Sequence, residues 1–500
     1  MKYFRAPGRT GWLVCAVAIA HLAGAATIGI NHYEFDPAQD GPLLSQLSPA
    51  PVPLRMTFYR HDVAGAEDYF DSQVAAATEA GVPILGVLGY STPSDSSMPS
   101  DFDFTEISPF NVSWHTADGS LCWGSEGESG SVRYLWHTKL EDGDAFPRVV
   151  EARPASDINF VHGTVALAIP PGHSVVLWAQ VGFVQSPKWT GHAVFSVTYA
   201  NGDDFHTLAR LEKRYDGALG ILTADLTGLA GTTATLFLNV DAVPGRATGS
   251  PVWQAAGILV DGAPMSMTQA VGGNLQSVIN YPPQDFGAFA AYAGNLARRY
   301  PQIREWEVWN EPNLAFFWRP SVNAAAYCDL LGKVYQAVKA ANPDALVVLG
   351  GLSPGSGDQT GHALPAVDFL KQIYQAGGEP FFDVLGFHAY GVDPLQDWLP
   401  AALQAIRQVM EANGDGFKPV WITETGWYSS GNGSATEAEQ AECLRQALAI
   451  LGAVAYVERV YWYTLRDSGD SGDPEQNYGL FHADGSPKPA AVALTAALQE

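Results

Sequence analysis

The chain has 500 residues, of which 47% are hydrophobic and 16% are charged, and its formal net charge at pH 7 is −25. This length is enough for two or three domains, and the composition is that of a globular protein rather than a disordered one. The negative charge argues against a nucleic-acid partner, because binding to phosphates needs a basic surface. It also disfavours a strongly anionic polymer as the substrate.

The first 25 residues have the pattern of an export signal. Three basic residues precede a mostly apolar stretch at residues 11–22, and an A-x-A motif at residues 23–25 offers a cleavage site. The apolar stretch is short for a membrane span, which needs about 20 residues. We therefore expect a secreted or periplasmic protein that has no membrane contact, with an uncleaved N-terminal anchor as the alternative.

Residues 26–94 alternate between short apolar runs and a helical pattern. The runs at residues 27–31, 53–59 and 83–89 predict parallel strands that are buried on both faces. Residues 66–80 predict a helix between the second and third strands. This segment is therefore expected to be the first part of a catalytic barrel.

The pattern changes between residues 95 and 277, where no long helix is evident. Alternating runs at residues 175–181, 193–199 and 234–240 are separated by turn signals, and this spacing predicts an antiparallel β-sandwich. The segment is a candidate carbohydrate-binding module, and a spacer that shapes one wall of a cleft is the alternative. Four tryptophans could present rings to a polysaccharide: Trp123, Trp136, Trp189 and Trp253.

Strands and helices alternate again in residues 278–500, the second part of the barrel. Asp285 is a plausible N-cap for the first helix of this part. Five strands are predicted at residues 305–309, 345–350, 384–387, 419–423 and 460–464, with helices at residues 285–300, 323–341, 366–376, 398–412, 435–452 and 488–498. Three strands before residue 95 and five after residue 277 predict an α/β fold, a (β/α)8 TIM barrel with an antiparallel β-sandwich domain inserted after the third strand.

Two glutamates follow barrel strands and have aromatic neighbours. Glu311 comes after the fourth predicted strand, in the sequence WEVWNEPN, and Glu424 comes after the seventh, in WITETGW. Barrel enzymes carry their chemistry at the C-terminal ends of the strands. Since strands four and seven face each other across the barrel mouth, the two carboxyl groups could lie about 5 Å apart, the separation of a retaining glycosidase.

The residues around these glutamates resemble clan A of the glycoside hydrolases. An Asn-Glu-Pro sequence after the fourth strand, here Asn310 to Pro312, with a second glutamate after the seventh strand, is the pattern of that clan. Residues 306–318 are most similar to family 39 and its bacterial relatives, whereas residues 423–427 are closer to family 5. The resemblance covers residues 27–92 and 280–500.

This resemblance implies roles for individual residues. Glu311 corresponds to the general acid/base and Glu424 to the nucleophile. Arg55 matches an arginine that clan members keep close to the nucleophile, and Asn310 matches an asparagine that binds the 2-hydroxyl group of the sugar.

Further substrate-binding candidates follow other strands. By the resemblance, His388 and Tyr390 match a pair after the sixth strand whose tyrosine orients the nucleophile, and Trp462 matches an aromatic floor for the sugar. His32, after the first strand, could contact sugar, as could Trp427. Three further tryptophans flank the carboxylates and could line sugar subsites or serve only in packing: Trp306, Trp309 and Trp318.

Together these patterns predict an exported retaining glycoside hydrolase that cleaves O-glycosidic bonds of an oligo- or polysaccharide. One alternative is a transglycosidase that uses the same site, in which an acceptor sugar replaces water. A second is a non-catalytic carbohydrate-binding protein, although the two intact glutamates argue against it. No cofactor is expected, and the histidines lack the spacing of a zinc site.

Overall fold

A computed structural model describes the protein over fifteen segments: residues 26–32, 35–59, 66–90, 113–116, 119–121, 130–155, 159–188, 190–201, 204–265, 280–319, 321–355, 363–390, 395–430, 434–469 and 474–499. The expected export signal lies outside these residues. Among the helices that are described, none has the length and apolar character of a membrane span. The chain divides into two compact units, one built from Ser97–Ile279 and the other from the segments on either side of it.

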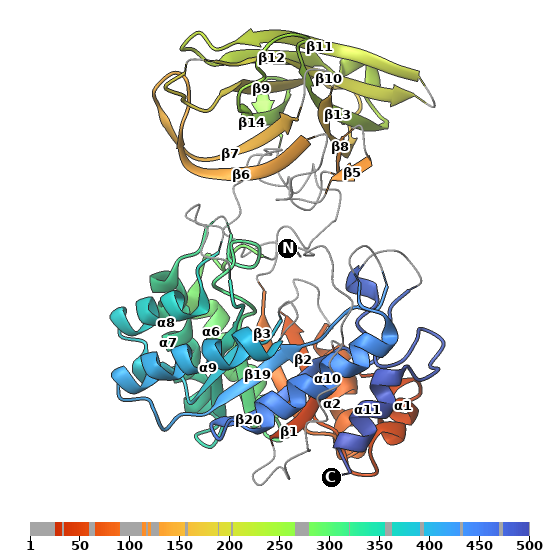
Figure 1. Ribbon diagram of the computed structural model, residues 1–500, viewed down its shortest axis with the longest axis vertical. Coiled ribbons are helices and arrows are strands. Elements are labelled where there is room, and N and C mark those ends of the chain that lie inside the picture. The colour runs from red at the N-terminus through yellow and green to blue at the C-terminus, as the bar shows by residue number, and fades with distance from the viewer. Residues whose placement is uncertain are drawn as a thin grey trace. The chain divides into compact units, whose positions relative to one another are not determined.

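The second unit is a closed barrel of eight parallel strands (Figure 1), which confirms the predicted fold class. Strand β3 pairs directly with β16, although every strand of the sandwich lies between them in the sequence. In their order around the barrel, the strands are β1 (Thr27–Asn31), β2 (Leu54–Tyr59), β3 (Ile84–Gly89), β16 (Glu305–Val308), β17 (Leu346–Leu352), β18 (Val384–His388), β19 (Val420–Thr425) and β20 (Val457–Tyr463).

Each barrel strand is followed along the chain by a helix, which after β3 comes only once the sandwich is complete. Local signals set where these helices begin: the side chains of Asp285 and Asn323 cap two of them, and Thr436 and Glu439 form a capping box on a third. The helices are α1 (Asp40–Leu47), α2 (Ala66–Glu79), α6 (Phe286–Arg299), α7 (Ala324–Ala341), α8 (Ala366–Gln375), α9 (Leu395–Ala412), α10 (Glu437–Gly452) and α11 (Pro489–Ala497), with short 3-10 turns at η2 (Glu379–Phe381) and η3 (Pro474–Gln476).

The helix α1 was not expected from the sequence. It has only eight residues, and Gly41 and Pro42 near its start conceal the helical pattern. Its leucines Leu43, Leu44 and Leu47 are buried in the main hydrophobic core. The apolar side of α1 therefore contributes to this core, as in the longer helices.

Side chains of β16 alternate between the hydrophobic core and the barrel interior. Trp306 is fully buried against Phe58 in an edge-to-face contact, with ring centroids 5.4 Å apart. Glu305 instead pairs with Arg459 of β20, and Glu307 pairs with Arg55 of β2. Because neither β20 nor β2 is a neighbour of β16 in the sheet, these ion pairs cross the barrel interior.

The first unit is a sandwich of two antiparallel sheets. One has the order β11-β10-β13-β8-β4-β5 and the other β12-β9-β14-β7-β6, with β15 beside β14. Its strands are β4 (Ser113–Thr116), β5 (Gly119–Leu121), β6 (Gly130–Lys139), β7 (Ala145–Pro154), β8 (Phe160–Ala168), β9 (Val175–Phe183), β10 (His192–Asn201), β11 (Asp204–Arg214), β12 (Gly220–Asp225), β13 (Thr233–Ala242), β14 (Pro251–Val260) and β15 (Ala263–Pro264), and η1 (Thr227–Leu229) follows β12.

One of the four candidate tryptophans of the sandwich is buried in its hydrophobic core. Trp253 is 1% exposed and packs edge-to-face on Phe195, so its ring is not available to a polysaccharide. Trp123, Trp189 and the side chain of Trp136 lie outside the described residues. Carbohydrate binding by the sandwich therefore stays a prediction.

Candidate active site

The two candidate glutamates lie at the C-terminal ends of their strands. Glu424 is the second-last residue of β19, where its Cα is paired with that of His388 in β18. Glu311 comes three residues after the end of β16. The register of β18 with β19, and of β19 with β20, shifts at this level, and such irregularities re-aim side chains near active sites.

The turn that carries Glu311 has an unusual backbone. Trp309 and Glu311 both have positive φ, 70° and 42°, a conformation that costs free energy for side chains other than glycine. The turn is held by hydrogen bonds from the Trp309 N–H to Leu88 O, at 2.8 Å, and from the Glu311 N–H to Gly351 O, at 3.1 Å. The surrounding structure therefore fixes the direction in which the Glu311 side chain leaves the strand.

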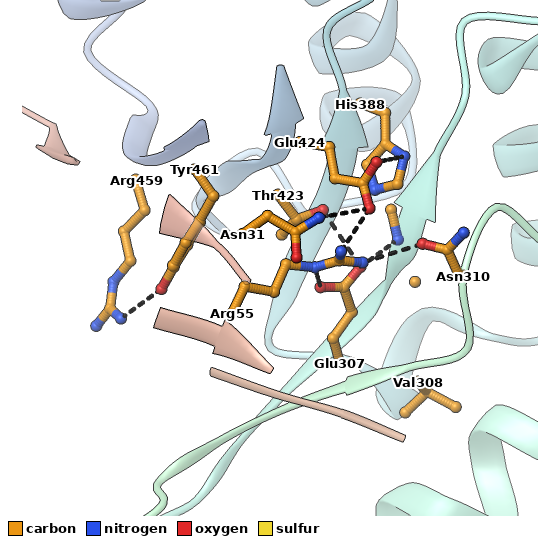
Figure 2. Close-up of polar contacts among 12 residues, drawn as sticks. Asn31, Arg55, Glu307, Val308, Asn310, His388, Thr423, Glu424, Arg459 and Tyr461 are labelled. Atoms are coloured by element: carbon orange, nitrogen blue, oxygen red, sulfur yellow. Dashed lines mark hydrogen bonds and ion pairs between the residues drawn. The ribbon is translucent and has the colours of Figure 1, made fainter. Parts of the chain in front are cut away.

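Three donors surround the carboxylate of Glu424, and Figure 2 shows two of them, Arg55 and Asn31. Arg55 Nη1 and Asn31 Nδ2 both donate to Oε1, at 2.5 Å and 3.0 Å. The Tyr390 hydroxyl donates to Oε2 at 2.9 Å. Hydrogen bonds to both oxygens favour the charged form of a carboxylate and hold it in one orientation.

His388 links the two glutamates. Its Nδ1 lies 2.8 Å from Glu311 Oε1 and 3.5 Å from Glu424 Oε2. Because both distances start from one nitrogen, these two oxygens are at most about 6.3 Å apart, a limit that allows the roughly 5–5.5 Å of a retaining pair and is shorter than the roughly 6.5–9.5 Å of an inverting pair. The imidazole is fully buried and packs directly on Gly351, where a Cβ would lie 2.1 Å from Nε2.

The electrostatic environment moves the pKa values of the two carboxyl groups in opposite directions. Burial raises the pKa of Glu311, and the nearby charge of Glu424 adds to this effect, although His388 opposes it. Burial alone would also raise the pKa of Glu424, but the charges of His388 and Arg55 and the hydrogen bonds from Tyr390 and Arg55 bring that pKa below its ordinary value. One carboxyl group is therefore disposed to keep a proton and the other to lose it.

The pKa values of the neighbouring groups fit this division. Burial would lower the pKa of His388, but the charges of Glu424 and Glu311 outweigh it, so the pKa of the imidazole is raised. Burial and the charge of Glu424 keep the pKa of Tyr390 well above its ordinary value, so its hydroxyl stays a donor.

A further glutamate belongs to this cluster and was not singled out from the sequence. Glu307 is fully buried and receives hydrogen bonds from Arg55 Nε at 2.7 Å and Arg55 Nη2 at 3.0 Å. It also accepts from the Gly351 N–H at 2.8 Å and the Thr423 hydroxyl at 3.2 Å. The second contact of Arg55 Nη2 is with Asn310 Oδ1, at 3.1 Å, which brings Asn310 into the same network.

The aromatic candidates differ in exposure. Trp427 is partly exposed and its ring lies 5.9 Å from that of Trp462, which is buried and donates its N–H to the Tyr478 carbonyl oxygen. The three tryptophans that flank Glu311 are each at most 1% exposed, so they serve in packing rather than as sugar platforms: Trp306, Trp309 and Trp318.

His32 lies after β1, and its contacts are with the protein. Its Nε2 is 3.1 Å from Asp40 Oδ2 in α1, and its Nδ1 is 3.5 Å from Thr464 Oγ1. The His32 side chain is partly buried and lies beside Asp40 in α1 and Thr464, which follows β20. Among the described residues, its hydrogen bonds are with these two side chains and not with Glu311 or Glu424. In the part of the chain that is described, no cluster of three or more histidine, cysteine or acidic side chains could hold a metal ion.

The comparison with protein families identifies this region. A family described as the glycosyl hydrolase catalytic core matches residues 302–493, the stretch that carries both glutamates. Residues 302–493 are therefore similar to a glycosyl hydrolase catalytic core. The resemblance to glycoside hydrolases that was inferred from the sequence is thereby confirmed. No curated protein matches the chain.

Several solved structures are similar to parts of the chain. A monomeric β-xylosidase from Caulobacter crescentus is 22% identical over 43% of this chain and 47% of its own, with a TM-score of 0.34. A family 39 glycoside hydrolase from Bacteroides cellulosilyticus is 19% identical over 64% and 80%, with a TM-score of 0.36. The CBM22-1 and GH10 modules of an endo-1,4-β-D-xylanase from Clostridium thermocellum are 11% identical over 81% and 96%, with a TM-score of 0.33. This chain thus spans about half the length of the first of these structures.

Proposed function

We propose that the protein is a retaining glycoside hydrolase that acts on an oligo- or polysaccharide. The observation that carries this proposal is the contact of Glu311 and Glu424 with one nitrogen of His388, at 2.8 Å and 3.5 Å, in environments that move their two pKa values in opposite directions. A retaining mechanism needs two such carboxyl groups close together, one protonated and one ionised.

The first step forms a covalent glycosyl-enzyme. The ionised Oε of Glu424 attacks the anomeric carbon, and the bond from that carbon to the glycosidic oxygen breaks. Glu311 gives its proton to the departing oxygen, so the leaving group departs as a neutral alcohol. The hydrogen bonds from Arg55, Asn31 and Tyr390 hold the Glu424 carboxylate in place for the attack.

The second step returns the enzyme to its starting state. Glu311, now ionised, takes a proton from water, and the oxygen of that water attacks the anomeric carbon and releases Glu424. Two displacements at one carbon give a product with the configuration of the substrate. Asn310 is held by Arg55 beside the acid/base, which supports a role in binding the sugar next to the scissile bond.

The same proposal includes export. Its support is the sequence of residues 1–25, with its basic start, apolar centre and A-x-A motif. An exported enzyme would meet polysaccharides that lie outside the cell. Expression of the full-length chain, followed by N-terminal sequencing of the secreted protein, tests this point, and an intracellular product with an intact N-terminus would contradict it.

A substrate screen tests the catalytic proposal. Wild type is assayed on a panel of aryl glycosides and polysaccharides, beside Glu424→Ala and a Glu411→Ala control on the outer helix α9. We expect the control to match wild type and Glu424→Ala to lose turnover. A 2-fluoro glycoside of the sugar that is cleaved should label Glu424, as read by mass spectrometry of peptides, and unchanged turnover in Glu424→Ala or a label elsewhere would refute the assignment.

A further inference from the structure

Below the two candidate catalytic glutamates, a third carboxylate connects four strands of the barrel. Glu307 is fully buried in β16 and contacts Arg55 of β2, Gly351 of β17 and Thr423 of β19. Figure 2 shows its carboxylate facing the Arg55 guanidinium, with Glu424 on the other side of that group. A buried carboxylate with this many donors is held in one place.

Each partner of the Glu307 carboxylate either forms a hydrogen bond with a candidate catalytic glutamate or is next to one in the chain. Arg55 donates to Glu424 Oε1, and Thr423 is the residue before Glu424 in β19. The Gly351 carbonyl oxygen accepts the hydrogen bond of the Glu311 N–H, while the Gly351 N–H is bound by the buried carboxylate. One side chain therefore supports the backbone or the partners of both glutamates.

The geometry of Arg55 makes this support directional. A guanidinium group is planar and rigid, so fixing two of its nitrogens fixes the direction of the third. Glu307 occupies Nε and one hydrogen of Nη2, which leaves Nη1 for Glu424 at 2.5 Å and the remaining hydrogen of Nη2 for Asn310 at 3.1 Å. If Glu307 were removed, the guanidinium could rotate away from both.

We propose that Glu307 is a positioning residue for the hydrolysis, which acts through Arg55, Thr423 and Gly351 to set the places of Glu311 and Glu424 and to offset the positive charge of Arg55. This inference rests on the proposed function. The offset has a chemical purpose: a carboxylate held too strongly by an uncompensated cation is a weaker nucleophile, because its pKa is driven further down.

We expect the charge of Glu307 to reach the catalytic pair through Arg55, which contacts both Glu307 and Glu424. Glu424 faces Arg55 from β2, His388 from β18, Tyr390 after β18 and Glu311 after β16. Replacing Glu307 with glutamine removes one negative charge from this group without changing the shape of the side chain. Because a negative neighbour favours protonation, its loss lets both catalytic carboxyl groups lose their protons at lower pH.

The test compares Glu307→Gln with Glu305→Gln. Glu305 lies two residues earlier on the same strand and binds both Nη atoms of Arg459 at 2.5 Å and 2.6 Å, so it forms a comparable but only partly buried ion pair, with an arginine away from the two candidate catalytic glutamates. For Glu307→Gln on the aryl glycoside that wild type cleaves, we expect kcat/KM to fall about 10- to 100-fold, mostly through kcat. Both limbs of its pH profile should move to lower pH, whereas Glu305→Gln should keep the wild-type profile.

A second variant keeps the inference testable if Glu307→Gln does not fold, as judged by circular dichroism. Glu307→Asp retains the charge but shortens the side chain, so we expect a reduced kcat with the pH limbs at their wild-type positions. A wild-type rate in Glu307→Asp, or a wild-type rate and profile in Glu307→Gln, would overturn the inference. Equal losses in Glu307→Gln and Glu305→Gln without a shift of the profile would also overturn it, since that result indicates a purely structural ion pair.

The Glu424→Ala variant separates this result from the proposed function. If Glu424→Ala is inactive and Glu307→Gln behaves as wild type, only the positioning role fails. If Glu424→Ala keeps its turnover, the proposed mechanism fails and the positioning role fails with it.

Discussion

The Tyr390 hydroxyl donates a hydrogen bond to Oε2 of Glu424, with the two oxygens 2.9 Å apart. Tyr390 follows β18 and Glu424 is the second-last residue of β19, so the contact joins two neighbouring strands at the mouth of the barrel. Arg55 and Asn31 hold the other oxygen of the same carboxylate. The Tyr390 hydroxyl thus holds Oε2 and fixes the rotation of the Glu424 carboxylate about its Cγ–Cδ bond.

We expect Tyr390→Phe to lower kcat/KM about 10- to 100-fold, because a hydrogen bond to a charged group contributes about 1.5–3 kcal/mol. The acidic limb of the pH profile should move to higher pH, since the lost bond favoured ionised Glu424. Tyr374→Phe is the matched control, because the Tyr374 hydroxyl also donates to a carboxylate at 2.9 Å, on Asp415. A change of the same size in both variants would contradict the prediction.

The pKa directions of the two glutamates predict a bell-shaped pH profile of kcat/KM. Glu424 must be ionised, and its pKa is held below the ordinary 4.5, so the acidic limb should lie below pH 4.5. Glu311 must be protonated, and burial raises its pKa, so the alkaline limb should lie above pH 4.5. Initial rates at low substrate concentration across pH measure both limbs, and an acidic limb above pH 4.5 would be inconsistent with this assignment.

The close packing of His388 on Gly351 gives a prediction about a single methyl group. In Gly351→Ala the new Cβ would lie 2.1 Å from His388 Nε2 and 2.5 Å from Thr423 Oγ1, so one or both side chains must move. We expect kcat/KM to fall about 100-fold, and the overpacking to cost about 1–3 kcal/mol of unfolding free energy in urea titrations.

Gly41→Ala in α1 is the control for that variant, because nothing lies within 4 Å of its added Cβ. It should leave the rate and the unfolding free energy close to those of wild type. A fully active Gly351→Ala enzyme would show that His388 can move without loss of catalysis.

Replacement of the proposed acid/base should depend on the leaving group. Glu311→Gln cannot donate a proton, so hydrolysis of a substrate with a poor leaving group should slow by about 10² to 10⁴. An aryl glycoside whose phenol is a strong acid needs little protonation, and formation of the glycosyl-enzyme should be nearly unaffected. Burst kinetics on such a substrate measure this step, and equal losses with good and poor leaving groups would argue against the role of Glu311.

The barrel was predictable because its strands are short continuous apolar runs that alternate with helices. The runs that contain Leu85 and Leu349 carry no polar residues, and the run that contains Ile422 begins with three apolar ones, as expected for strands buried on both faces. The two glutamates were found because each follows such a run. The distances between their side chains were not predictable, because they depend on strand register and on the bulges near His388 and Thr425.

Glu307 was missed although the sequence contained a signal for it. In β16 the residues alternate as Glu305-Trp306-Glu307-Val308, and the period of two places both glutamates on one face. A charge inside a parallel barrel needs a partner. Arg55 and Arg459, the arginines of strands β2 and β20, supply those partners, but their assignment required the barrel order and the register.

The pairing of β3 with β16 also bears on how the protein is made. A ribosome synthesises the chain from its N-terminus, so β1, β2 and β3 emerge long before β16, and the whole sandwich is produced in between. During that interval the outer edge of β3 has no partner strand, and unpaired edges of apolar strands promote aggregation. A folded insert has less chain entropy left to lose on barrel closure than a flexible loop of the same length. The order of synthesis therefore links the maturation of the barrel to the folding of the sandwich, whether or not the sandwich ever touches a substrate.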